Sequence, residues 1–144
     1  MEEFDKACFD DDLTEVLTSE VAKRCKIEKM ADLEVSVALE PRVAPAEAFV
    51  ARLRWTSYPS GLPSLKFLDG IRGGDSNPKA WPTGQGMRAP SLDSCMHWTL
   101  EGHGLHPEWN SVASYRLDVE GNVLRQALMF LRQWFDNEYT GRHQ

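Results

Sequence analysis

Reactive side chains are concentrated in one stretch of the chain, SLDSCMHWTLEGHGLHPEWN, residues 91–110. Cys95 is a candidate nucleophile, because a cysteine thiolate attacks carbonyl carbons readily. His97, His103 and His106 are candidate general bases. His97 lies two residues from Cys95, so in an extended segment both side chains project to the same side. The stretch therefore predicts acyl chemistry at a thiol, assisted by an imidazole.

The same residue types allow other chemistry. The pattern C-x-H-x5-H-x2-H, formed by Cys95 and the three histidines, offers four ligands that zinc accepts, although it lacks a paired C-x2-C. Asp93 and Glu101 could orient an imidazole or an incoming amine. A cysteine protease would use Cys95, a histidine and Asn110, but such enzymes place the cysteine at a helix N-terminus. No helix signal is evident after Cys95.

Composition limits the function. The chain has 144 residues with 42% hydrophobic and 26% charged side chains, which suits one globular domain. The formal net charge of −6 argues against nucleic-acid binding, which needs a basic face. No apolar run has the length of a membrane span, and the acidic start MEEFDKACFDDDL is unlike a signal peptide. We therefore expect a cytoplasmic protein without nucleic-acid or membrane partners.

The cysteine count is odd, which in a cytoplasmic protein indicates free thiols rather than a disulfide framework. Cys8 lies among carboxylates, which should raise the pKa of its thiol and reduce its reactivity. Cys25 falls on an apolar stripe of a predicted helix and should face the core. Cys95 is thus the favoured nucleophile.

The order of predicted elements is simple. We expect an acidic, loosely held leader over residues 1–12 and a helix over residues 13–30. Alternating apolar residues predict strands at residues 33–39 and 49–55, with a third strand at 64–69. Short turns between these strands predict an antiparallel meander.

A long irregular segment, residues 70–110, follows the meander. We expect Trp81, Trp98 and Trp109 to anchor it by burial. Gly84 and Gly86 are either turn residues or places where another backbone approaches closely.

The clearest helix comes last. Asn122 is its expected N-cap and Gly141 its expected C-terminal glycine. Its apolar face comprises Val123, Leu124, Ala127, Leu128, Leu131, Trp134 and Phe135, with Arg125, Arg132 and Gln133 mostly opposite. The predicted fold class is α+β: one domain over residues 1–144 with an N-terminal helix, an antiparallel β-meander, a long active-site loop and a C-terminal helix.

The segment YPSGLPSLKFLD (residues 58–69), followed by WPTGQG, Cys95, HPEW and the Asn122 helix, resembles the ubiquitin-conjugating enzyme family. The family carries a His-Pro-Asn motif about eight residues before its cysteine. Here Met87 stands at that distance, and the nearest upstream asparagine is Asn77. The chain also ends soon after the last helix, where the family has two more. In both respects it resembles divergent bacterial members, which are encoded beside activating-enzyme-like and ubiquitin-like proteins in defence systems.

The resemblance implies a carrier that accepts a ubiquitin-like protein on Cys95 as a thioester and passes it to an amine of a protein acceptor. His106 first, and His97 second, would replace the missing asparagine. The activating-enzyme-like partner would contact the N-terminal helix around residues 18–29, where basic side chains gather: Lys23, Arg24, Lys26 and Lys29. No cofactor or metal is implied. The alternatives are a catalytically inactive scaffold of the same fold, and the zinc-binding module described above.

Overall fold

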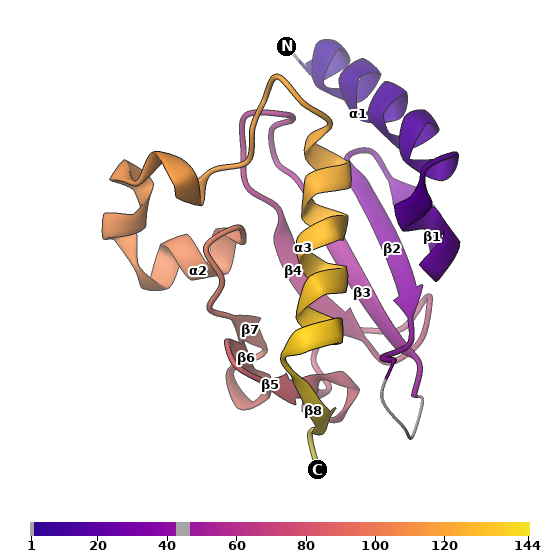
Figure 1. Ribbon diagram of the computed structural model, residues 1–144, viewed down its shortest axis with the longest axis vertical. Coiled ribbons are helices and arrows are strands. Elements are labelled where there is room, and N and C mark those ends of the chain that lie inside the picture. The colour runs from indigo at the N-terminus through magenta and orange to yellow at the C-terminus, as the bar shows by residue number, and fades with distance from the viewer. Residues whose placement is uncertain (1, 43–46) are drawn as a thin grey trace.

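The computed structural model describes residues 2–42 and 47–144. A four-stranded antiparallel sheet of order β1-β2-β3-β4 forms its framework, and a long helix, α3, lies across one face (Figure 1). The helices and strands are α1 (Glu2–Leu17), β1 (Cys25–Ala31), β2 (Glu34–Leu39), β3 (Phe49–Arg54), β4 (Ser64–Leu68), β5 (Pro82–Gly84), β6 (Met87–Arg88), β7 (Asp93–Ser94), α2 (Leu100–Leu105), α3 (Val123–Asn137) and β8 (Tyr139–Arg142).

Strand register explains why one face of the sheet is apolar. In the antiparallel ladders, Val37 pairs with Ala51, which pairs with Phe67 on the next strand. All three side chains are buried, because residues opposite one another point to the same face. The ring of Phe135 from α3 lies 6.1 Å from that of Phe67. The predicted meander is therefore confirmed for β2, β3 and β4, and α3 covers its apolar face.

The beginning of the chain differs from the prediction. Residues 2–12 are not a loose leader, because α1 spans Glu2–Leu17 and buries Phe9, Leu13 and Val16. The helix predicted for residues 13–30 is wrong in its second half, where Cys25–Ala31 form β1, an edge strand paired with β2. Cys25 is accordingly half-buried at the start of a strand rather than on a helix. The chain leaves the helix at Ser19, whose hydroxyl donates to the Val16 carbonyl.

The predicted basic helix is corrected as well. Its four cationic side chains lie on the short 3-10 turn Glu20–Arg24 and on β1. The N-terminal helix itself is acidic, with seven carboxylates: Glu2, Glu3, Asp5, Asp10, Asp11, Asp12 and Glu15. The basic residues are thus not on the helix but beside it, where Lys29 pairs with Asp10 of α1 at 2.7 Å.

The last helix agrees with the sequence at its start. Asn122 Oδ1 accepts the Arg125 N–H at 2.8 Å, and every side chain of the predicted apolar face is buried. Arg132 was predicted to lie on the polar face of the helix, but it is buried. Its side chain donates to the Glu40 carbonyl at 2.8 Å. Gly141 does not end the helix; it belongs to β8 and pairs with Thr83. Across the described ranges, no helix combines the length and apolarity needed to cross a membrane.

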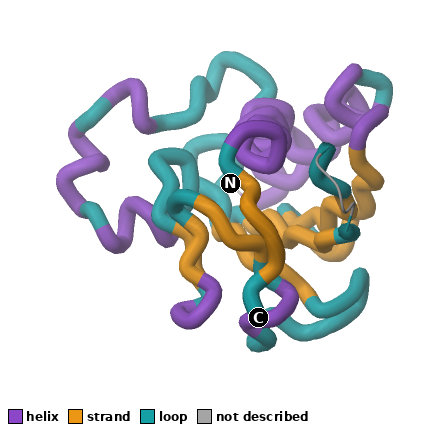
Figure 2. The backbone as a smooth tube through the Cα atoms, turned by 60° about the horizontal axis from the view of Figure 1, so that its bottom comes forward, coloured by secondary structure: helices purple, strands orange, loops and turns teal. Residues whose placement is uncertain are grey.

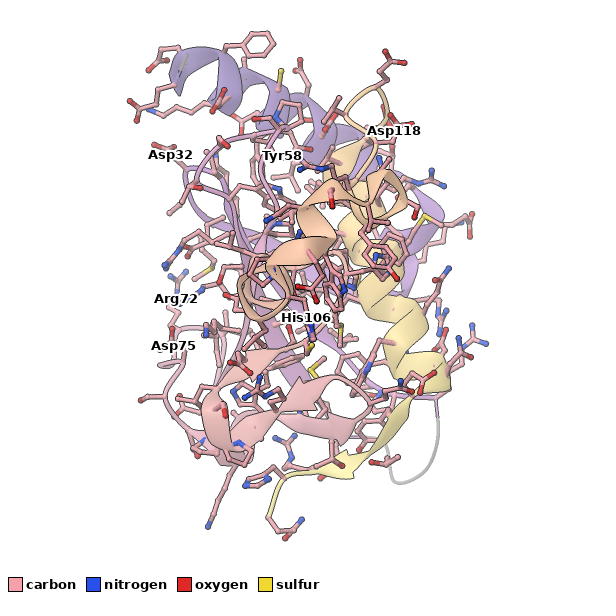
Figure 3. All side chains as sticks on the ribbon, turned by 90° about the vertical axis from the view of Figure 1, so that its left-hand side faces the viewer. Asp32, Tyr58, Arg72, Asp75, His106 and Asp118 are labelled. Atoms are coloured by element: carbon pink, nitrogen blue, oxygen red, sulfur yellow. The ribbon has the colours of Figure 1, made fainter. Side chains whose placement is uncertain are left out.

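Tyr58 fixes the N-terminal end of α3. Its hydroxyl donates to the Asp12 carboxylate of α1 and accepts the Leu124 N–H at 3.0 Å. Burial, together with the hydrogen bond to Asp12, raises the pKa of Tyr58 well above its usual range. The side chain lies beneath α1 in Figure 3, and its ring is 5.1 Å from that of Phe9. One residue from the turn after β3 therefore joins α1 to α3.

We predict that Tyr58→Phe lowers the free energy of unfolding by about 1–3 kcal/mol, because the buried Leu124 N–H and the Asp12 carboxyl both lose their partner. Urea unfolding measures this change. Tyr139→Phe is the matched control: it removes a hydroxyl that donates to Glu47 Oε2 at 3.0 Å in a more open place, and should cost about 0.5 kcal/mol. Equal losses in the two variants would contradict this role for Tyr58.

Candidate active site

Cys95 follows a small hairpin formed by β6 and β7. Its N–H donates to the Gly86 carbonyl at 2.6 Å, which fixes the backbone at the cysteine. Gly86 has φ +86°, and a Cβ there would lie 3.1 Å from the Cys95 carbonyl oxygen. The positive φ therefore favours glycine here, and a Cβ would also crowd the cysteine carbonyl.

The residues after Cys95 are held by the first turn of α2. Thr99 is buried and caps this helix: its Oγ1 accepts the Gly102 N–H at 3.0 Å and lies 3.1 Å from the Met96 carbonyl, to which it donates. A Cβ on Gly102 would lie only 2.0 Å from that same carbonyl oxygen. The helix thus packs directly on the backbone next to Cys95. Its presence also corrects the expectation that no helix follows the cysteine.

The free edge of β4 carries α2. The Leu100 N–H donates to the Pro63 carbonyl at 2.8 Å, and the Glu101 carboxylate accepts the Leu65 N–H at 3.0 Å. Lys66 donates to the Leu92 carbonyl at 2.6 Å, beside the β6–β7 hairpin. The segment between β7 and α3 extends away from β1 as a series of short helical turns (Figure 2). Glu101 therefore supports the loop through β4 instead of orienting an imidazole.

Cys95 lines a groove of about 490 Å³, called here the cysteine groove. Cys95 itself is half-buried. Five aromatic residues line the groove, and α3 contributes one side of it. The lining residues are Gln85, Gly86, Cys95, Met96, His97, Trp98, Trp109, Tyr115, Phe130, Gln133, Trp134, Asn137 and Glu138. A groove that holds a thiol among apolar walls with a few polar groups can bind an extended acyl donor.

The other two thiols lie outside this groove. Burial raises the pKa of the Cys8 thiol, and the carboxylates of Asp12 and Asp11 raise it further, as the sequence predicted for its acidic surroundings. Burial also raises the pKa of Cys25, although Arg132 and Arg24 partly offset the effect. Both thiols are thus less readily ionised than an ordinary cysteine.

His97 is the histidine that shares the groove with Cys95. Its ring lies 5.0 Å from the Phe130 ring and 5.4 Å from the Tyr115 ring, and its Nδ1 is buried without a hydrogen-bond partner among the described residues. Burial lowers the pKa of His97, and the nearby His103 lowers it further. A neutral imidazole in this position can accept a proton at neutral pH.

The other two histidines of the stretch lie elsewhere. His103 is buried, with Nδ1 2.9 Å from Asn110 Oδ1 and Nε2 2.7 Å from the His97 carbonyl oxygen. It therefore holds the loop together. His106 is at the surface (Figure 3), stacks on Trp109 at 4.3 Å and pairs with Glu108 at 3.2 Å. It does not line the cysteine groove, so its predicted catalytic role stays a prediction.

The geometry does not favour the metal or protease alternatives. Among residues 2–42 and 47–144, no three or more His, Cys, Asp or Glu side chains gather as a metal site would require. His103 and Asn110 are paired, but both line a different pocket from the one that Cys95 lines. Asp93 pairs with Arg88 at 3.4 Å. The residue types are present in the sequence, but they are not brought together.

Two of the three predicted anchors of the loop are confirmed. Trp81 and Trp98 are buried, whereas Trp109 is half-buried and lines the groove. A Cβ on Gly84 would lie 2.3 Å from the Glu138 carbonyl oxygen, so this glycine packs against the end of α3. The backbone carbonyl of Gln85, next to it, accepts the Trp134 Nε1–H at 2.7 Å. These contacts bring α3 to the cysteine.

Several groove residues were missed by the sequence analysis. Phe130, Gln133 and Asn137 come from α3, more than thirty residues after Cys95. The apolar spacing of this helix predicted which of its side chains face the core. It did not predict which loop packs against the other side chains. The signal available in the sequence was an aromatic residue, Phe130, that lies outside the predicted apolar face of the helix.

No family model matches the chain, and the searches of curated proteins and of solved structures found no match either. The functional assignment therefore depends on the site itself.

We predict that Gly102→Ala displaces the segment that carries Cys95, because the new Cβ would overlap the Met96 carbonyl. The expected loss in the free energy of unfolding is about 1–3 kcal/mol. Gly104→Ala, in the same helix, meets no atom within 4 Å and should instead stabilise the protein by about 0.5–1 kcal/mol. Urea unfolding measures both, and a neutral Gly102→Ala would contradict the close packing.

We also predict that His97 makes stability depend on pH. Because its pKa is lowered in the folded state, the unfolded chain binds more protons as the pH falls through 6.5, the ordinary value. The free energy of unfolding should therefore decrease from about pH 7 to 5, and less steeply in His97→Gln. Urea unfolding at each pH gives the two slopes; equal slopes would contradict the effect of burial.

Proposed function

We propose that the chain is a carrier of the ubiquitin-conjugating type, which accepts a ubiquitin-like protein as a thioester on Cys95 and transfers it to an amine of a protein acceptor. The observation that carries the proposal is that Cys95 lines the groove. The other two thiols, Cys8 and Cys25, lie away from it. The order of helix, four-stranded meander, cysteine loop and α3 supports it.

The reaction has two balanced steps. Cys95 Sγ attacks the C-terminal carbonyl carbon of the ubiquitin-like protein, and the thiolate of the activating enzyme leaves. An amine of the acceptor then attacks the same carbon, loses a proton to a base, and the Cys95 thiolate leaves. Neither step needs a cofactor or an electron transfer.

The groove offers groups for both steps. His97 is the imidazole that lines the groove with Cys95, so we assign it the base role ahead of His106. A donor to the tetrahedral oxyanion contributes a few kcal/mol in related chemistry. Gln85, Gln133 and Asn137 line the groove with side-chain amides, and one of these amides would take the place of the family asparagine.

The structure changes the charge expected on the surface that would contact the activating-enzyme-like partner. The N-terminal helix is acidic, and the basic side chains of residues 23–29 lie beside it on the 3-10 turn and β1. An activating-enzyme-like protein that contacts the N-terminal helix would therefore need a basic surface there.

The test is a non-reducing gel after incubation with ATP, the ubiquitin-like protein and the activating-enzyme-like protein of the same genome. We expect a thiol-sensitive adduct in the wild type, in Cys8→Ala and in Cys25→Ala, and none in Cys95→Ala. Cys95→Ser should give an adduct that thiols do not release, because an oxygen ester replaces the thioester.

An adduct that persists in Cys95→Ala would overturn the assignment of the thiol. If active partners gave no adduct with the wild type, the chain would instead be an inactive scaffold.

A further inference from the structure

A second large pocket lies beside the last turns of α3. Its volume is about 510 Å³, and it is called here the basic pocket. The last residues of β2 form much of its wall. Four cationic side chains from three separate parts of the chain line it: Arg24, Lys26, Arg42 and Arg132. The net charge of the protein is −6, so the positive charge around this pocket is opposite in sign to that of the molecule as a whole.

Two of these arginines are held rigidly by one carboxylate. Arg24 donates to both oxygens of Asp136, at 2.8 and 3.0 Å, and Arg132 donates to Asp136 at 3.2 Å and to the Glu40 carbonyl at 2.8 Å. Burial alone would raise the pKa of Asp136, but the hydrogen bonds from Arg24 and Arg132 outweigh it and lower the pKa. Asp136 is therefore ionised at neutral pH and already shared between two guanidinium groups.

The remaining cations have spare hydrogen-bonding capacity. Among residues 2–42 and 47–144, Lys26 makes no hydrogen bond through its side chain, and Arg42 reaches Asp136 only at 3.6 Å. Arg132 is more than nine-tenths buried, and its Nε has no hydrogen-bond acceptor among the residues that the structure describes. Counting Glu40 and Asp136 against the four cations leaves an excess of two positive charges around the pocket. Lys26 and Arg42 are exposed, whereas Arg132 is buried, so the excess charge lies at the mouth of the pocket. A concentration of positive charge around a pocket attracts an anion.

We propose that the basic pocket binds a phosphoryl group carried by a small molecule. A phosphate dianion matches the excess of two charges, and its oxygens point in several directions, as do the cations around the pocket. Guanidinium groups fixed by Asp136 suit such an anion, because little side-chain entropy is lost when it binds. The volume leaves room beyond the phosphoryl group for the molecule that carries it.

This site is independent of the cysteine groove. Gln133 and Asn137 line the groove, whereas Arg132 and Asp136 belong to the basic pocket and its support. Phosphate binding can therefore be measured without any partner protein.

The experiment titrates the whole chain with inorganic phosphate and follows amide chemical shifts, at constant ionic strength with sodium chloride. We expect saturable shifts confined to residues 24–26, 39–42 and 132–136, and much smaller shifts with acetate. Lys26→Gln/Arg42→Gln should weaken phosphate binding at least about tenfold, because two charge-assisted contacts are lost. Phenyl phosphate distinguishes a carried phosphoryl group from free phosphate: tighter binding than inorganic phosphate is expected.

The matched control is Lys23→Gln/Arg125→Gln, which removes the same charge from exposed positions that do not line the pocket. It should leave the affinity within about twofold of the wild type. Equal weakening in the two double variants, shifts spread over the surface, or no saturation by about 20 mM phosphate would each overturn the proposal. Phenyl phosphate binding no tighter than phosphate would restrict the site to the free ion and overturn the small-molecule part.

Discussion

The fixed position of α3 is the constraint on which the rest of the molecule depends. Its first turn is bound by the Tyr58 hydroxyl, which also binds Asp12 of α1, so the two helices cannot shift independently. From that point α3 crosses the apolar face of the sheet (Figure 1). Its last turns then contribute Trp134 to the cysteine groove and Arg132 to the basic pocket. The helix whose first turn is bound by Tyr58 therefore lines both pockets with its last turns.

Close backbone packing fixes the position of the loop that carries Cys95. Gly102 leaves no room for a side chain beside the Met96 carbonyl, and Gly86 lies against the Cys95 carbonyl. Thr99 adds hydrogen bonds on the same short segment. The proposed protein substrate would thereby meet a thiol on a loop with few conformations, which reduces the entropy lost on binding.

Local patterns predicted the parts of the fold whose burial is regular. Strands β2 to β4 and α3 follow from alternating and helical apolar spacing. The edge strand β1 was missed because its half-exposed residues continue the helical composition that precedes them. The acidic α1 was missed because only three of its residues are buried. The groove was beyond prediction, since its walls meet through a contact between Trp134 and Gln85, 49 residues apart.

The measurement that tests the central claim most directly is the site of acyl transfer from a chemically prepared C-terminal thioester of the ubiquitin-like protein, mapped by peptide mass spectrometry. No activating enzyme is needed, so the result reports on this chain alone. The cysteine groove predicts that the acyl group is found on Cys95 and not on Cys8 or Cys25. Acylation spread over all three thiols, or absent from Cys95, would contradict the account.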